Sequence, residues 1–259
     1  MGKDLIIHWY PEVDSTNRLA WEQAASSSQQ TVWAALNQTG GRGQRGNTWT
    51  SDAGKNLTFS WLFKPVNLSP SRQFLISQVA ALGICDYLSR WNLPSRIKWP
   101  NDIYVEDRKI CGILIEHSLT SERILHSIVG IGLNLNQTGF PDFLPNPTSV
   151  QLERQRLCPG GEIQPLDLQE ELLHLMTCLL HRASLLEDED TGRPSLERDY
   201  LGRMYRLGET ASYLDKTTVV HRRFTGTILG IDERSCLRVL DQELGQERTF
   251  AFQEIAYCL

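Results

Sequence analysis

A glycine-rich segment with two arginines, residues 40–47, is the first part of the sequence that could do chemistry. It reads Gly-Gly-Arg-Gly-Gln-Arg-Gly-Asn, with the arginines at positions 42 and 45. Glycines let the backbone approach a ligand closely, and a guanidinium can pair with both oxygens of a carboxylate or phosphate. The segment lacks the Gly-Lys-Ser/Thr end of a Walker loop, and its spacing does not fit dinucleotide binding. It is either an anion-binding loop or a solvent loop with two incidental arginines.

A second candidate is Lys98-Trp99-Pro100-Asn101-Asp102. A strand end followed by a proline turn can bring a cation, an amide and a carboxylate around one point. The same residues would also make an ordinary turn. The sequence leaves both interpretations open.

Three further clusters have the same ambiguity. Lys109 opens an otherwise apolar strand that runs to Glu116, where it is either a solvated flank or a strong point charge inside a cavity. Asn134 and Asn136 end a buried strand, where asparagine commonly makes turns. The residues of 15–17, Ser-Thr-Asn, are good helix caps as well as polar ligands.

The elements that must position these residues alternate between strands and helices. Apolar runs with a period near two predict strands at 5–10, 31–36, 57–63, 97–99, 103–105, 110–115 and 123–135. Helical spacing predicts a short helix after Asn17, long helices over 70–91 and after the N-cap Asp167, and a short one near Ser195. Pro11 is expected to end the first strand.

The last fifty residues differ from the rest in the length and spacing of their apolar runs. Short β-rich runs at 217–220, 224–229, 236–240 and 249–252 are separated by glycine and acidic turns. This pattern predicts a small antiparallel β-barrel. We place a domain boundary near residue 205, which divides the chain into domains 1–204 and 205–259.

Composition excludes several classes of protein. The 259 residues carry 31 acidic and 26 basic side chains, which argues against binding to nucleic acid through bulk positive charge. No apolar run approaches the ~20 residues of a bilayer span. Residues 1–10 lack the apolar core of a signal peptide, so we expect a cytoplasmic protein. The six cysteines form no CxxC pair and lack a histidine at zinc-ligand spacing, so we expect reduced, mostly buried thiols.

Taken together and in this order, these segments resemble the biotin protein ligases. The resemblance runs from Ser15 to Ser149, and the C-terminal part is similar in kind. Its most specific pieces are Gly-Arg-Gly-x-x-Gly-x-x-Trp at 41–49, Lys-Trp-Pro-Asn-Asp at 98–102, Arg-Lys-x-x-Gly-Ile-Leu-x-Glu at 108–116 and Gly-Ile-Gly-x-Asn at 130–134. The resemblance implies an α+β fold: a mixed β-sheet flanked by helices, like the class II aminoacyl-tRNA synthetases, with a small C-terminal antiparallel β-barrel.

The resemblance also implies a reaction. Such enzymes join biotin to ATP, giving biotinyl-adenylate and pyrophosphate, and then pass the biotinyl group to one lysine of a biotin carboxyl carrier protein or domain. By analogy, the catalytic residues are Lys109, between the carboxylate and the α-phosphate, and Arg42, which neutralises the carboxylate and then the adenylate phosphate. Residues matching the nucleotide side are Arg45, Trp49, Lys98, Asn101, Lys109, Asn134 and Asn136. Magnesium is implied by the family, with no ligand set readable from the spacing.

Burying the ureido ring of biotin without hydrogen-bond partners would be unfavourable. The residues implied for biotin are Ser15, Thr16, Asn17, Gln38, Arg42, Gly43, Gln44, Trp49, Lys109 and Gly112, the first four at the ureido ring. Leu133, Ile113 and Trp49 are expected as apolar walls. We expect the loop 40–49 to be poorly ordered without ligand. Many members have arginine where Gln44 and Asn47 stand, which predicts weaker adenylate retention or a transfer of that work to Arg45.

Three alternatives share part of this pattern: a ligase with a DNA-binding domain, a lipoate or octanoyl transferring enzyme, and an inactive binding module. Some biotin ligases carry an N-terminal helix-turn-helix. Here the first motif begins at Ser15, so we expect a monofunctional ligase that binds neither DNA nor membrane and is compatible with a homodimer. Lipoate ligases and octanoyltransferases share the fold, but the loop followed by Trp49 favours biotin. A catalytically inactive binding module is disfavoured by the retained Arg42, Asn101 and Lys109.

Overall fold

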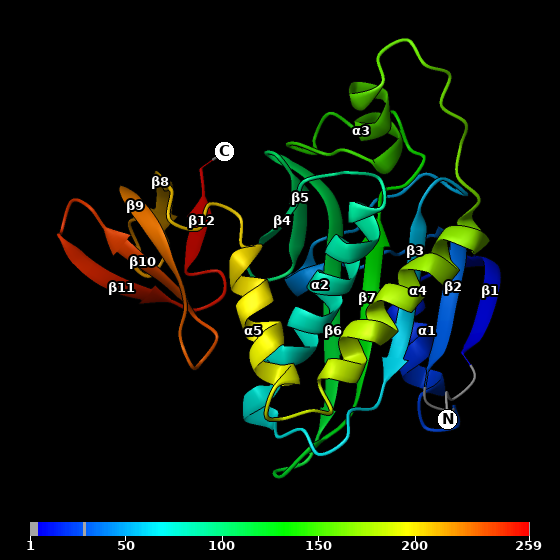
Figure 1. Cartoon of the computed structure of the whole chain (residues 1–259), viewed down its shortest axis with the longest axis horizontal. Helices are drawn as coiled ribbons and strands as arrows, with labels where there is room; N and C mark the ends of the chain where they lie inside the picture. The colour runs from blue at the N-terminus through cyan, green and yellow to red at the C-terminus, as the bar shows by residue number, and fades with distance from the viewer. Residues whose placement is uncertain (1–4, 28–29, 259) are drawn as a thin grey trace.

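A seven-stranded sheet forms the centre of the larger part of the molecule (Figure 1). The structure is a computed structural model that describes residues 5–27 and 30–258, without the side chain of Arg45. The strand order is β1-β2-β3-β7-β6-β5-β4, in which β1 and β2 pair in parallel and all other neighbours pair antiparallel. The strands are β1 (Ile6–Val13), β2 (Thr31–Gln38), β3 (Leu57–Phe63), β4 (Ser95–Lys98), β5 (Asp102–Val105), β6 (Arg108–Leu119) and β7 (Ile124–Leu133). The prediction of a mixed sheet is confirmed.

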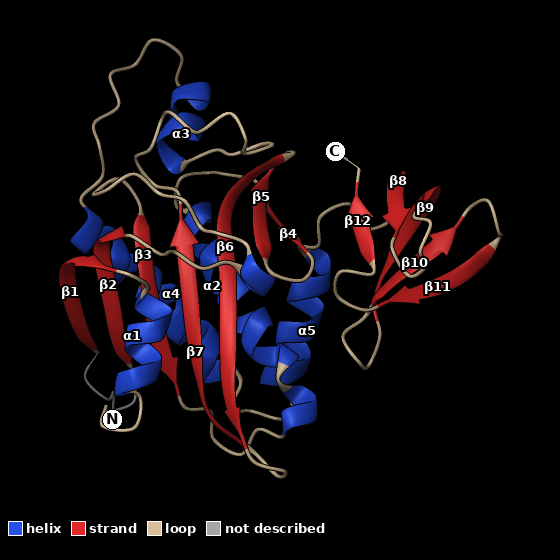
Figure 2. Ribbon diagram, turned by 180° about the vertical axis from the view of Figure 1, so that it is seen from behind, coloured by secondary structure: helices blue, strands red, loops and turns tan. Residues whose placement is uncertain are grey.

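Helices cover both faces of this sheet. Helix α1 (Thr16–Gln23) lies on one face, while α2 (Phe74–Ser89), α4 (Leu168–Leu185) and α5 (Gly192–Gly202) lie on the other (Figures 1 and 2). Two short 3₁₀ helices, η1 (Gln44–Gly46) and η2 (Pro70–Arg72), and helix α3 (Val150–Leu157) complete this part. Helix α2 is apolar and buried nearly all round because it lies between the sheet and α4.

The C-terminal part is a second sheet of five antiparallel strands in the order β11-β10-β9-β8-β12. They are β8 (Thr210–Asp215), β9 (Arg222–Ile231), β10 (Leu237–Asp241), β11 (Gln246–Phe250) and β12 (Ile255–Tyr257). The predicted antiparallel sheet is therefore confirmed. The described strand pairings do not include one between β11 and β12 that would close it into a barrel.

One predicted boundary, one predicted strand and one unpredicted helix are corrected. Strand β1 continues past Pro11 to Val13, because a proline is tolerated on an edge strand. Residues 217–220 are not a strand: Val219 and Val220 are exposed, and the strand precedes them at β8. Helix α3 was missed in the sequence, although Ser149 caps it by accepting a hydrogen bond from the backbone N–H of Leu152 at 3.2 Å.

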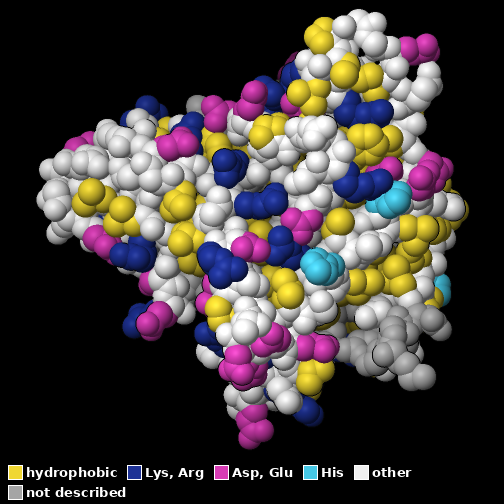
Figure 3. Space-filling view, in the orientation of Figure 1, with side chains coloured by type: hydrophobic (Ala, Val, Ile, Leu, Met, Phe, Trp, Pro, Cys, Tyr) yellow, Lys and Arg dark blue, Asp and Glu magenta, His cyan; other side chains and the backbone are white. Residues whose placement is uncertain are grey.

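The surface charges are mixed in sign (Figure 3) and the cysteines form no disulfides within the described residues. Figure 3 shows lysines and arginines interspersed with acidic side chains over one face of the molecule. All six cysteines are free, but only Cys85 and Cys111 are fully buried, so the prediction of mostly buried thiols is too broad. Within residues 5–27 and 30–258, the longest apolar helices fall short of what a membrane crossing requires.

Candidate active site

A cavity of about 660 Å³ lies where the larger sheet meets the second sheet. Its walls come from segments far apart in the sequence: the start of α1, the glycine-rich loop, the residues around Lys98 and Lys109, β7, and residues 252–257. Most of the predicted site residues line it, namely Ser15, Thr16, Asn17, Gln38, Arg42, Gly43, Gln44, Trp49, Lys98, Asn101, Lys109 and Gly112. The structure therefore brings Arg42 and Lys109 to one cavity.

A buried polar cluster forms one end of the cavity. The Gln38 side-chain oxygen accepts hydrogen bonds from the backbone N–H of Thr16 at 2.8 Å and from its hydroxyl at 3.1 Å. The Ser60 hydroxyl lies 2.6 Å from Asn17 Oδ1 and 2.8 Å from Thr16 Oγ1. Thr16 and Asn17 stand at the start of α1, where backbone N–H groups have no partner within the helix. The cluster can offer donors and acceptors to a small polar ring.

Gly130 makes room for this cluster. A Cβ atom on Gly130 would lie 2.0 Å from Asn17 Oδ1. In the sequence, the asparagines that follow this part of β7 were its predicted functional residues. The structure shows that a glycine is needed for the contact with Asn17.

Lys109 is held by an ion pair across the hairpin of β5 and β6. Its Nζ lies 2.7 Å from Asp102 Oδ1, and it is 5.7 Å from the centre of the Trp49 ring. The carboxylate and the face of the indole ring both attract the side-chain nitrogen and so hold it in one place. The Lys-Trp-Pro-Asn-Asp motif and Lys109 therefore meet at one point, through Asp102.

Trp49 lies flat against β6 and β7. A Cβ atom on Gly132 would lie 2.3 Å from Trp49 Cε2, and one on Gly112 would lie 2.9 Å from Cζ3. Within the described part of the chain, the buried indole Nε1 has no hydrogen-bond partner. The two glycines thus let the indole form a wall of the cavity.

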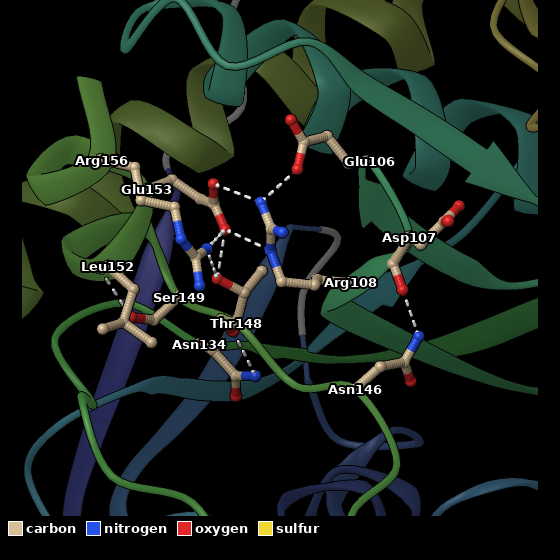
Figure 4. A network of polar contacts seen from close by, with 10 residues as sticks. All are labelled: Glu106, Asp107, Arg108, Asn134, Asn146, Thr148, Ser149, Leu152, Glu153 and Arg156. Atoms are coloured by element: carbon tan, nitrogen blue, oxygen red, sulfur yellow. Dashed lines mark hydrogen bonds and ion pairs between the residues drawn. The ribbon is translucent and has the colours of Figure 1, made fainter. Parts of the chain in front are cut away.

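The backbone of Lys109 is held by the segment 146–148. Its N–H donates to the Asn146 carbonyl at 2.8 Å, and its carbonyl accepts from the Thr148 N–H at 2.9 Å. Figure 4 shows what anchors this segment: the Thr148 hydroxyl donates to the carboxylate of Glu153, which also pairs with Arg108. Glu153 is buried, and both of its oxygens bond to the Arg108 guanidinium at 3.2 Å.

Lys98 and Asn101 lie near the second sheet. Lys98 Nζ is 5.0 Å from the Tyr104 ring centre and 4.9 Å from that of Tyr257 on β12. Burial lowers the pKa of Lys98, and the carboxylate of Asp102 opposes that shift. The Asn101 amide donates to the Ile113 carbonyl at 2.8 Å and so holds β6, while its second N–H remains available for another acceptor.

The glycine-rich loop is a small hairpin. Gly43 N–H donates to the Asn47 carbonyl at 2.7 Å, and Trp49 N–H donates to that of Gly41 at 3.0 Å. The loop is tied to β6 by an ion pair of 3.1 Å between Arg42 and Glu116. The predicted contact of Arg45 with the nucleotide depends on a side chain that lies outside the described part.

Asn134 and Asn136 are placed differently from the prediction, because neither lines the cavity. The Asn134 amide donates to the Thr148 carbonyl at 2.9 Å. Asn136 bonds with both ends of its side chain to the backbone of Leu166. Of the predicted apolar walls, Ile113 and Trp49 line the cavity, whereas Leu133 lies in the core.

Some site residues were not predicted. Ser60 and Glu116 hold the polar cluster and the loop. The sequence offers only a weak signal for each, since Ser60 is a polar residue within the predicted strand 57–63 and Glu116 ends the motif at 108–116. From the C-terminal part, the lining residues are Lys216, Phe252, Gln253, Ile255, Ala256 and Tyr257. Trp99 joins the two parts, since its ring meets that of Phe252 at 6.2 Å and its Nε1 donates to the Ser235 carbonyl at 3.1 Å.

Comparisons with known proteins agree with this geometry. Residues 9–134 match the biotin/lipoate A/B protein ligase family. The biotin–[acetyl-CoA-carboxylase] ligase of Paracoccus denitrificans is 33% identical over 233 residues, which cover 86% of this chain and 90% of that protein. The chain belongs to the biotin protein ligase family. It is accordingly an ATP-dependent biotin ligase.

Two further relatives extend the match to the whole described fold. The bifunctional ligase/repressor BirA of Bacillus subtilis is 29% identical over 255 residues, covering 92% of this chain and 69% of BirA. The solved structure of the biotin protein ligase from Aquifex aeolicus in complex with biotin and ATP is similar with a TM-score of 0.76 at 25% identity, covering 97% of each chain. Both parts of this biotin ligase thus have a counterpart in the Aquifex enzyme.

Proposed function

We propose that this cavity joins biotin to ATP, releasing pyrophosphate, and then passes the biotinyl group to one lysine of a biotin carboxyl carrier domain of a carboxylase. The observation that supports this best is the presence of Arg42, Lys109 and a buried polar cluster in one cavity. Two cations and a set of fixed hydrogen-bonding groups match a carboxylate, a triphosphate and a ureido ring.

The first step brings two anions together. An oxygen of the biotin carboxylate attacks the α-phosphorus of ATP, and the bond to the pyrophosphate leaving group breaks. Lys109 stabilises the negative charge that concentrates there, and Arg42 neutralises the carboxylate. Asp102 keeps the Lys109 ammonium in position through their 2.7 Å ion pair.

Biotin occupies the end of the cavity near α1. Ser15, Thr16, Asn17 and Gln38 satisfy its ureido ring, with Ser60 holding Asn17 in place. Gly43, Gln44 and Gly112 border the ligand, and Trp49 covers it. The apolar chain of biotin then leads its carboxylate towards Arg42 and Lys109.

The nucleotide occupies the end near the second sheet. Lys98, Asn101 and Trp49 contact it from the larger part, and Arg45 from the loop. Lys216 and Gln253 add contacts from the C-terminal part. Asn134 acts at a distance by holding Thr148. Magnesium arrives with the triphosphate as part of the substrate; the described residues hold no cluster of three or more acidic, histidine or cysteine ligands.

In the second step, the ε-amine of the carrier lysine attacks the carbonyl carbon of the mixed anhydride. The new amide C–N bond forms, the C–O bond to the phosphate breaks, AMP leaves, and the amine proton goes to solvent. Covering the adenylate until the carrier arrives protects it from hydrolysis.

Exchange of labelled pyrophosphate into ATP tests the assignment. The assay is run separately with biotin, lipoate and octanoate. Exchange that depends on biotin alone is expected. Exchange with either fatty acid but not with biotin would overturn the proposal.

We extend the proposal to the organisation of the enzyme. Residues 1–204 and 205–259 act as two domains, with the second sheet closed as a small barrel, and the ligase works in the cytoplasm without DNA or membrane. A homodimer would form through a strand edge, and sedimentation equilibrium of the purified chain would test this.

A further inference from the structure

Glu116 is a charged residue whose role the proposed function leaves open. Its carboxylate divides between two partners: Oε1 lies 3.1 Å from Arg42 Nη2, and Oε2 accepts from the Asn17 amide at 2.9 Å. Asn17 belongs to the biotin end of the cavity and Arg42 to the loop. One side chain therefore touches both of the groups that would recognise opposite ends of biotin.

The position of Glu116 follows from the alternation of β6. Gly112, Leu114 and Glu116 point to the same face of the sheet, because successive side chains on a strand alternate. Gly112 and Leu114 line the cavity, whereas Glu116 lies one step beyond its edge. Its side chain is 32% exposed, so the carboxylate remains partly hydrated.

The contact with Asn17 fixes the orientation of a buried amide. Asn17 is 4% exposed, and its Oδ1 accepts from the Ser60 hydroxyl at 2.6 Å. Its Nδ2 donates to Glu116 at 2.9 Å and approaches the Leu114 carbonyl at 3.3 Å. Removing the carboxylate would leave only the longer bond to hold the nitrogen.

The contact of Glu116 with Arg42 weakens biotin binding, whereas its contact with Asn17 strengthens it. A carboxylate paired with the guanidinium offsets the positive charge that Arg42 offers to an anion in the cavity. The carboxylate of biotin must then compete with that of Glu116 for the same group. The two contacts of one residue therefore have opposite effects on the binding of biotin.

We propose that Glu116 is a positioning residue that sets the biotin affinity from outside the cavity, orienting Asn17 with one oxygen and competing with biotin for Arg42 with the other. This inference rests on the proposed function of Arg42 at the biotin carboxylate. It identifies a determinant of biotin affinity that does not contact biotin.

Two substitutions separate the two contacts. Glu116→Gln keeps an oxygen for the Asn17 amide but removes the charge from Arg42, so the dissociation constant of biotin should fall by about twofold to fivefold, the range of an exposed ion pair. Glu116→Ala removes both contacts, so biotin should bind more weakly than to the glutamine variant. Calorimetric titration with biotin gives these constants, and pyrophosphate exchange at saturating biotin and ATP gives a kcat that both variants should retain.

A second readout follows the loop itself. Trypsin should cut after Arg42 faster in Glu116→Gln than in the unsubstituted enzyme, because the ion pair to β6 is lost. The matched control is Glu12→Gln, since Glu12 also accepts from an asparagine amide, that of Asn37, at 2.7 Å but lies on β1 away from the cavity. This control should change neither the biotin affinity nor the rate of cutting.

The Arg42→Ala background separates the inference from the function on which it rests. There, Glu116→Gln should no longer tighten biotin binding, since the competition has been removed. If Arg42→Ala alone leaves biotin binding unchanged, the proposed role of Arg42 fails. Suppose instead that Arg42→Ala weakens biotin binding, but Glu116→Gln as a single substitution does not tighten it. The proposed role of Glu116 is then wrong and that of Arg42 stands. The same holds if Glu116→Ala and Glu116→Gln bind biotin equally.

Discussion

Lys109 and Asp102 face each other across β5 and β6, with 2.7 Å between the ammonium and the carboxylate. The ammonium thus has a defined place beside the cavity, from which it can stabilise charge without rearrangement. Its neighbour Arg108 points to the other face, where Glu153 holds it. Adjacent residues on one strand therefore face different surroundings, Lys109 the cavity and Arg108 the anchoring carboxylate of Glu153.

Replacing Lys109 by alanine should remove this charge while leaving the fold intact. We expect adenylate formation to fall by about 10²- to 10³-fold, the usual effect of removing one fixed electrostatic group. Pyrophosphate exchange measures the loss, and circular dichroism checks the fold. Lys55→Ala, an exposed lysine outside the cavity lining, is the control. Near-normal exchange in Lys109→Ala would remove this residue from its role.

The sequence predicted single site residues best where a charged side chain stands among glycines or beside an apolar run. Arg42 between glycines and Lys109 before an apolar run were found in this way, and both line the cavity. Ser60 was missed because a serine inside an apolar strand looks like tolerated polarity, and its partners on α1 are distant in sequence. Asn136 lies outside the cavity lining and bonds to the backbone of Leu166, a role that the sequence does not distinguish from contact with a ligand.

At the scale of elements, the loop at residues 40–49 should become better protected from proteolysis when substrates bind. It is joined to the rest of the molecule by the partly exposed ion pair of Arg42 with Glu116, by the packing of Trp49 and by the hydrogen bond from Gly40 N–H to the Asp14 carbonyl. We predict that trypsin cuts after Arg42 and Arg45 more slowly when biotin and ATP are both present. Equal rates of cutting with and without the substrates would refute ordering of the loop.

The network of Figure 4 joins β6, helix α3 and the segment before α3 around the buried carboxylate of Glu153. Glu153→Ala should lower the free energy of unfolding by about 3 kcal/mol, because the buried anion holds Arg108 and Thr148. Urea denaturation measures this loss. Glu170→Ala on α4, where the side chain is 69% exposed, should change the free energy of unfolding by less than about 0.5 kcal/mol. Equal stability of the two variants would contradict the anchoring role of Glu153.

The element predictions succeeded where burial and periodicity agreed. Strand β3 was predicted with its observed bounds because every residue in it is apolar or small and both faces are covered. Residues 217–220 were wrongly predicted as a strand because two valines and two threonines suggest one, although nothing packs on Val219 or Val220. Helix α3 is mostly polar, so its hydrophobic pattern was too weak to reveal it.

At the scale of the whole molecule, the cavity needs both sheets. The ring of Phe252 packs against Trp99 with 6.2 Å between centres, and Tyr257 covers Lys98. Phe252→Ala should raise the KM for ATP by about twofold to tenfold, the size of a lost aromatic contact, and leave the KM for biotin unchanged. Steady-state kinetics with each substrate varied in turn measures both. Phe143→Ala, at an exposed site outside the cavity lining, is the control. A larger effect on biotin than on ATP would contradict the placement of the nucleotide.

The wall formed by residues 252–257 comes from the last strand in the described part of the chain and the turn before it. Every other described strand, including those that carry Arg42's anchor and Lys109, precedes β12 in the order of translation. A ribosome therefore exposes the cationic half of the pocket before the half that encloses the nucleotide. A chain that ends ahead of Phe252 lacks this wall, so it should bind ATP more weakly and form less adenylate than a chain that carries it.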